Sequence, residues 1–126
     1  MNKQIIATQQ APGAIGPYSQ GIAIGNLVFT SGQLPIDMRT GELETADIAL
    51  ATRHALENVR AVVQAAGLDL AQVVKTTVFL TDLADFAAMN QTYADFFAQE
   101  PPARSCVQVA ALPKGARIEI EAVAAK

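Results

Sequence analysis

A chain of 126 residues with a net charge of −3 and a single cysteine predicts one domain, residues 1–126, that folds without a disulfide or a structural metal. Its nine basic residues are scattered, which argues against nucleic acid as a partner, and its one histidine has no second histidine or cysteine nearby to build a metal site. No leader and no apolar run long enough to span a membrane can be recognised, so we expect a cytoplasmic protein, and the apolar fraction of 51% favours a homo-oligomer.

The first third of the chain predicts short strands separated by a long loop. Residues 4–7 form a candidate strand, and APGAIGPYSQG at residues 11–21 is a turn-rich loop with two prolines and three glycines. Residues 22–33 follow as two strands joined at Gly25-Asn26, which is a hairpin signal.

The middle of the chain predicts two helices flanking a strand. Apolar residues at helical spacing indicate a helix over residues 45–66, with Gly67 as its stop, and His54 just off the apolar stripe is expected at the surface or at an interface. The β-branched run VVKTTVFLT at residues 73–81 favours a strand. A second helix is expected over residues 86–98, capped by Asp82 or Asp85 and stopped by Pro101-Pro102.

Two further strands, residues 103–110 and 117–124, complete the chain. The element order predicts an α+β fold in which two helices pack on one face of a single sheet. In the last strand, apolar residues alternate with Arg117, Glu119 and Glu121, so the charged residues are expected on the face away from the helices. The alternation in the preceding strand suggests that Arg104 and Cys106 share this non-helix face with Glu119.

Arg104 stands among small and apolar residues and has two interpretations. Its guanidinium is a permanent cation whose fork of donors matches a carboxylate, so it is a candidate anion clamp, with Glu119 close enough to orient water or to move a proton. In the alternative, Arg104 forms a structural ion pair with Glu119 or Glu121 across the sheet. The spacing alone leaves both open.

Two other features, Cys106 and the SGQ sequence, do not indicate a catalytic nucleophile or a phosphate-binding site. Cys106 has no neighbouring histidine or helix N-terminus that would lower its pKa, so we expect a small buried residue rather than a nucleophile. The SGQ sequence at residues 31–33 lacks the glycine spacing and the lysine of a phosphate loop.

Five motifs together cover nearly the whole chain: APGAIGPYSQG at 11–21, TSGQLP at 30–35, NVRAVVQAAG at 58–67, VVKTTVFLTDLADFAAMN at 73–90 and PARSCVQVAALPKGARIEIEA at 102–122. With these motifs the chain resembles the Rid family of YjgF-type reactive intermediate deaminases, and in particular its RidA subgroup, because Arg104 stands where that subgroup has its carboxylate-binding arginine. This resemblance implies a chorismate-mutase-like fold and a homotrimer, with the sheets forming a central barrel and three clefts lying between subunits.

The activity that the resemblance implies is hydrolysis of reactive 2-imino acids, such as 2-iminobutanoate and 2-iminopropanoate, to 2-oxo acids and ammonia. Such a deaminase protects pyridoxal-phosphate enzymes, and it needs no metal or organic cofactor. The implied site residues are Arg104 as the clamp for the substrate carboxylate, Glu119 as the holder of the attacking water, with Glu121 as its structural neighbour, and, as further substrate contacts, Tyr18, Ser31, the backbone at Ser105 and Cys106, and Asn90.

Two alternatives stay open beside the deaminase. In the first, the chain forms a trimer that binds 2-oxo acids or other metabolites without turnover. In the second, it is a chaperone-like or ribonuclease relative, and the acidic balance argues against a ribonuclease, which would have to bind RNA.

One departure from the family concerns residues 98–101, AQEP, where many members carry about three more residues. If this loop borders the cleft, its shortness is expected to open the mouth of the cleft and to affect substrate preference.

Overall fold

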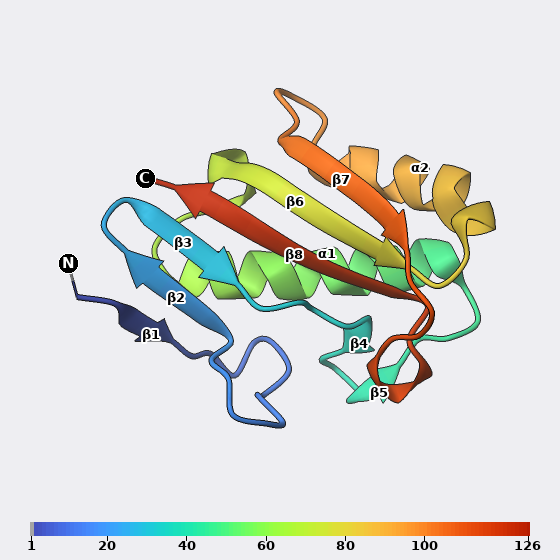
Figure 1. The fold of residues 1–126 in the computed structure, drawn as a ribbon, viewed down its shortest axis with the longest axis horizontal. Helices are drawn as coiled ribbons and strands as arrows, with labels where there is room; N and C mark the ends of the chain where they lie inside the picture. The colour runs from blue at the N-terminus through green and yellow to red at the C-terminus, as the bar shows by residue number, and fades with distance from the viewer. Residues whose placement is uncertain (1) are drawn as a thin grey trace.

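The computed structural model describes residues 2–126 and contains a six-stranded sheet covered on one face by two helices (Figure 1). The strands lie in the order β1-β2-β3-β8-β6-β7. All pairs are antiparallel except β6 and β7, which are parallel and connected through α2. The elements are β1 Gln4–Ile6, β2 Gly21–Ile24, β3 Leu27–Thr30, α1 Ile48–Ala65, β6 Val73–Leu80, α2 Phe86–Phe96, β7 Ala103–Gln108 and β8 Ile118–Ala125.

The predicted α+β class, with a sheet and two helices on one of its faces, is confirmed. Alternate residues of β8 are fully or nearly fully buried, as are their partners on β6 and α1, so the core fills the space between sheet and helices. The main core residues are Val28, Leu56, Val59, Val63, Val78, Leu80, Ile118 and Ile120. No helix within residues 2–126 is both long and apolar enough to cross a membrane.

The helix boundaries differ from the predicted ones because particular carboxylates cap them. Helix α1 begins at Ile48 rather than at residue 45, since the Asp47 side chain accepts hydrogen bonds from the amides of Ala49 and Leu50. Gly67 ends this helix with a φ of +85°, as expected of a glycine stop.

At the second helix, Asp82 and Asp85 have different roles. Asp82 caps the short 3₁₀ turn Leu83–Asp85 that precedes α2, whereas Asp85 makes no capping hydrogen bond. Instead, Asp85 accepts a 2.7 Å hydrogen bond from Arg117, whose other guanidinium nitrogen donates to the carbonyl of Ala46. Arg117 therefore connects the segments that precede the two helices, and its side-chain hydrogen bonds go to these segments and not to Glu119 or Glu121.

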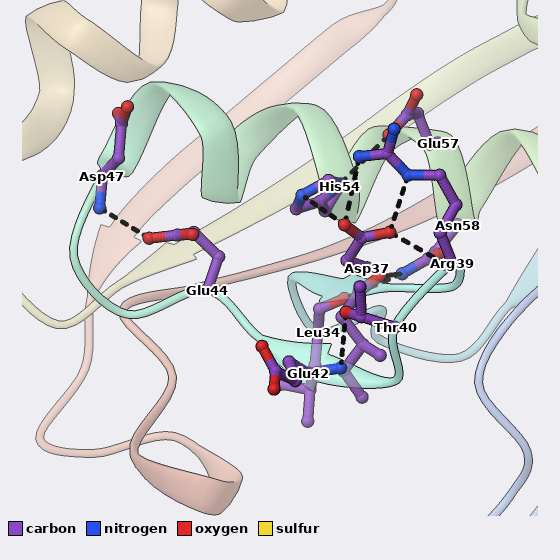
Figure 2. A network of polar contacts seen from close by, with 11 residues as sticks. Leu34, Asp37, Arg39, Thr40, Glu42, Glu44, Asp47, His54, Glu57 and Asn58 are labelled. Atoms are coloured by element: carbon purple, nitrogen blue, oxygen red, sulfur yellow. Dashed lines mark hydrogen bonds and ion pairs between the residues drawn. The ribbon is translucent and has the colours of Figure 1, made fainter.

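A small hairpin that the sequence pattern does not predict, β4 Ile36–Asp37 and β5 Glu42–Leu43, lies against α1 and is held there by polar contacts (Figure 2). The buried Asn58 amide donates to the carbonyls of Leu34 and Ile36, at 3.1 and 3.0 Å. Contrary to the surface or interface position expected for it, His54 is buried within the single chain, with its ring nitrogens facing the carboxylates of Asp37 and Glu57 (Figure 2). This network fixes the chain segment that leads out of β3.

Candidate functional site

The pairing register places Arg104 and Glu119 on opposite faces of the sheet. Arg104 lies beside Thr76 of β6, which pairs with Ala122 of β8, and both of these neighbours are buried under the helices. Cys106 lies in the corresponding row on the same face. Glu119 pairs with Phe79 of β6, which lies beside Val107, so these residues occupy the uncovered face.

The expectation that Arg104, Cys106 and Glu119 share the non-helix face is therefore wrong. Alternation shows which residues of one strand point the same way, but not toward which face of the sheet, and a shift by one residue exchanges the faces. The structural ion pair is excluded as well, since Arg104 contacts no carboxylate within 4.0 Å anywhere in residues 2–126. Arg104 and Glu119 belong to two separate pockets.

The arginine half-site is the pocket between α2 and the start of β7. The Arg104 guanidinium donates from one terminal nitrogen to Asn90 Oδ1 at 2.7 Å, so the structure brings Arg104 and Asn90 together. The pocket has a volume of ≈ 530 Å³, which is a size typical of small-molecule sites. It is lined by Asn90, Tyr93, Ala94, Phe97, Pro101, Pro102 and Arg104. Pro101, the last residue of the short AQEP loop, thus borders this pocket.

The glutamate half-site is a pocket of ≈ 440 Å³ on the other face, and it contains three of the expected residues, Tyr18, Ser31 and Glu119. Ser31 donates its hydroxyl to the carbonyl of Ser19, and its amide donates to the carbonyl of Gln20, so this serine fixes the loop that carries Tyr18. The full lining is Ile15, Tyr18, Ser31, Gly32, Leu34, Pro113, Glu119 and Glu121.

Burial raises the pKa of the Glu119 carboxyl, and the nearby charge of Glu121 raises it further. A carboxylate with a raised pKa is a stronger base than an exposed one. The side chain is confined by Gly32, where a methyl group added to the backbone would stand 2.7 Å from the Glu119 carboxyl carbon. The glutamate half-site therefore holds a basic carboxylate in one place.

Ser105 and Cys106 are divided between the two faces. Ser105 is exposed on the Glu119 face and accepts a 2.9 Å hydrogen bond from the Lys75 ammonium. Cys106 packs against the core on the helix face. Burial raises the pKa of its thiol, and the opposing effect of Arg104 is smaller, which agrees with the structural role expected for this cysteine.

Sequence reasoning missed the residues that surround the two charged groups. Phe86 and Tyr93 lie against the Arg104 guanidinium, and their spacing from Asn90 on one helix was the signal that could have identified them. Gly32 was recognised only as part of a motif, because its proximity to Glu119 arises from the pairing of Gln33 with Ile120. Within the described part of the chain, no three His, Cys, Asp or Glu side chains cluster as metal ligands would.

Comparison with known proteins agrees with this architecture. A RutC family protein of Sinorhizobium fredii, y4sK, is 56% identical over 118 residues, which cover 94% of each chain. The 2-iminobutanoate/2-iminopropanoate deaminase of Escherichia coli is 55% identical over 124 residues, 96% of each chain. The crystal structure of E. coli TdcF with bound serine superposes with a TM-score of 0.93 at 54% identity and covers 98% of each chain.

The family described as Endoribonuclease L-PSP matches residues 8–126, which is nearly the entire chain. The match confirms the resemblance that the sequence motifs carry, and the relatives align over almost their whole length. The chain therefore belongs to the endoribonuclease L-PSP family, to which the Rid proteins also belong.

Proposed function

We propose that this protein is a deaminase that hydrolyses 2-imino acids, such as 2-iminobutanoate and 2-iminopropanoate, to 2-oxo acids and ammonia. The observation that carries the proposal is the pair of half-sites: an arginine without a carboxylate partner in residues 2–126, and a half-buried glutamate whose pKa is raised. The first suits the substrate carboxylate and the second suits an attacking water. The relative from E. coli, 55% identical, carries the name of this activity.

The active form in this proposal is a homotrimer in which the arginine half-site of one subunit meets the glutamate half-site of the next. A single chain cannot bring both groups to one small molecule, because the sheet separates them. The face that carries Glu119 also exposes apolar side chains, among them Ile5 at 67%, Phe29 at 40% and Val107 at 42%. Burying such a face against copies of the same chain, with the sheets arranged as a central barrel, supplies both the driving force and the second half-site.

The proposed reaction needs only these groups. Arg104 fixes the substrate carboxylate, and Glu119 takes a proton from a water molecule as the water oxygen attacks the carbon of the imine in its N-protonated form, whose C=N electron pair moves to nitrogen. Glu119 then gives this proton to the nitrogen of the resulting carbinolamine. The C–N bond breaks as ammonia leaves, the C=O bond of the 2-oxo acid forms, and the hydroxyl proton passes to Glu119 and from there to ammonia or solvent. Holding water and imine in contact supplies much of the acceleration, so a modest general base is sufficient.

Two findings bear on the choice of substrate. The similar TdcF has been crystallised with serine, which has a carboxylate next to a nitrogen-bearing carbon, as a 2-imino acid has. A nuclease is not proposed, despite the family description, because the basic residues are scattered and the only histidine is held between Asp37 and Glu57, outside both half-sites.

The test is a competition for a freshly generated imine. An amino-acid oxidase or a pyridoxal-phosphate dehydratase produces the imine, and semicarbazide traps what the protein does not hydrolyse. The protein is expected to suppress the semicarbazone and to release ammonia faster than buffer does. No suppression with any imino acid from small to large would refute the deaminase, and binding of 2-oxo acids without turnover would then be measured.

The pH profile is expected to depend on Glu121. Glu119 acts as a base only when it is ionised, so kcat/KM divided by the uncatalysed rate should fall as the pH drops through the raised pKa of Glu119. Glu121→Gln removes one cause of this raised pKa, so the acid limb should move to lower pH. Glu42→Gln, a change of an exposed residue on β5, is the control and should leave the limb in place. An unmoved limb in Glu121→Gln would contradict the assignment of Glu119 as the base.

A further inference from the structure

The Arg104 guanidinium is held in place by groups that carry no charge. Asn90 accepts one hydrogen bond at 2.7 Å, and the guanidinium carbon lies 5.5 Å from the ring centre of Phe86 and 4.8 Å from that of Tyr93. Cation–π contacts attract the arginine without neutralising it. An arginine has five N–H donors, and Asn90 takes one of them, which leaves enough for a bidentate carboxylate.

The three neighbours form one stripe along α2. Phe86, Asn90 and Tyr93 follow one another at spacings of four and three residues, so their side chains lie on the same side of the helix. This side faces Arg104 on β7, the strand that directly follows α2 in the chain. The stripe is therefore built into the β6-α2-β7 unit and does not depend on another subunit.

Tyr93 is itself fixed. Its hydroxyl lies 2.7 Å from the Thr76 hydroxyl in a buried hydrogen bond, and its ring packs against Phe97 with 4.8 Å between the ring centres. Phe86 is 39% exposed and lies nearer the solvent. The arginine thus has one buried aromatic neighbour that is fixed by its own contacts and one that is partly exposed.

We propose that Phe86 and Tyr93, together with Asn90, are positioning residues that hold the Arg104 guanidinium ready for the substrate carboxylate while leaving its charge uncompensated. This inference rests on the proposed function, since it concerns the same carboxylate. An acidic residue in their place would position the arginine equally well, but it would compete with the substrate for the same donors.

The test uses Phe86→Leu, Tyr93→Leu and Tyr93→Phe, with Phe96→Leu as the matched control. Phe96 lies on the same helix and makes the same kind of contact with Arg53 and Arg60, but not with Arg104. Titration calorimetry measures the binding of 2-oxobutanoate, and NMR measures the ring-current shift of the Arg104 Nε–H resonance. Phe86 is exposed, so its leucine variant keeps the test valid even if Tyr93→Leu fails to fold.

We expect binding to weaken about threefold in Phe86→Leu and about tenfold in Tyr93→Leu, with KM rising and kcat changing less. Tyr93→Phe keeps the ring and loses only the hydrogen bond to Thr76, so about a threefold loss is expected. The ring-current shift of the Arg104 resonance should decrease in Tyr93→Leu, where only the Phe86 ring remains, and persist in Tyr93→Phe and Phe96→Leu.

Two results would overturn the inference in distinguishable ways. If the wild-type protein hydrolyses imino acids, but both leucine variants that fold bind 2-oxobutanoate as the wild type does, the aromatic neighbours have no positioning role. If the wild type neither hydrolyses imino acids nor binds 2-oxobutanoate, the proposed function fails and the inference fails with it.

Discussion

Refolding equal amounts of the Arg104→Ala and Glu119→Gln proteins together is expected to restore about one quarter of the wild-type activity. Each protein alone is expected to lose about 100-fold or more in kcat/KM, because it lacks either the proposed carboxylate clamp or the proposed base. The recovery follows from the opposite faces on which Arg104 and Glu119 lie. A site between two subunits works when one contributes Arg104 and its neighbour contributes Glu119, which random assembly achieves with about one-half times one-half probability.

The control for this experiment is a protein that carries both substitutions. Refolded with either single variant, it should restore nothing, since no cleft can then combine an intact arginine with an intact glutamate. If the mixture of single variants also remains inactive while forming mixed oligomers, the two residues do not meet across a subunit boundary. The proposed trimeric site would then be wrong.

Gly32→Ala is expected to lower kcat by about 10- to 100-fold while leaving KM nearly unchanged. The added methyl group would lie 2.7 Å from the carboxyl carbon of Glu119 and 2.9 Å from its Oε1, which is closer than atoms can pack. Backbone hydrogen bonds between Gln33 and Ile120, at 2.7 and 3.1 Å, hold the two chain segments together, so the Glu119 side chain must move instead. The arginine half-site on the other face is untouched, and substrate binding should persist.

Gly13→Ala is the matched control for this substitution. A methyl group at Gly13 meets no atom within 4 Å, and its backbone does not need a positive φ, so activity should be retained. Urea unfolding of both variants separates a displaced side chain from a general loss of stability. Wild-type kcat in a folded Gly32→Ala protein would show that the exact placement of Glu119 does not limit the reaction.

The sequence predicted the elements of this fold better than it predicted their faces. Hydrophobic periodicity located α1 and β8 because those signals lie within one element. It could not show that Arg104 turns toward α2, since this depends on the parallel register between β6 and β7, which is a long-range property. The hairpin β4–β5 was missed because two-residue strands carry no alternation that can be recognised.

Residue chemistry and strand alternation suggested Arg104 and Glu119 as candidates, whereas the other candidate site residues came from the family resemblance. Residue types alone left Arg104 as either a clamp or an ion-pair partner, and only the three-dimensional structure removes the ion pair. The short loop at residues 98–101 was expected to open the mouth of a cleft if it borders one, and its last residue, Pro101, lines the arginine half-site. Its effect on substrate preference stays a prediction.

The placement of the two half-sites also has a consequence for the order of folding. The contacts of the arginine half-site are local in the chain: Arg104 bonds Asn90 across 14 residues, and Tyr93 bonds Thr76 across 17. The glutamate half-site depends on β3 and β8, where the Thr30 hydroxyl accepts a hydrogen bond from the amide of Ala122 across 92 residues. Local contacts close with less loss of chain entropy. The arginine half-site is thus expected to form while the chain is still collapsing, and the glutamate half-site only when β3 and β8, from opposite halves of the chain, have paired.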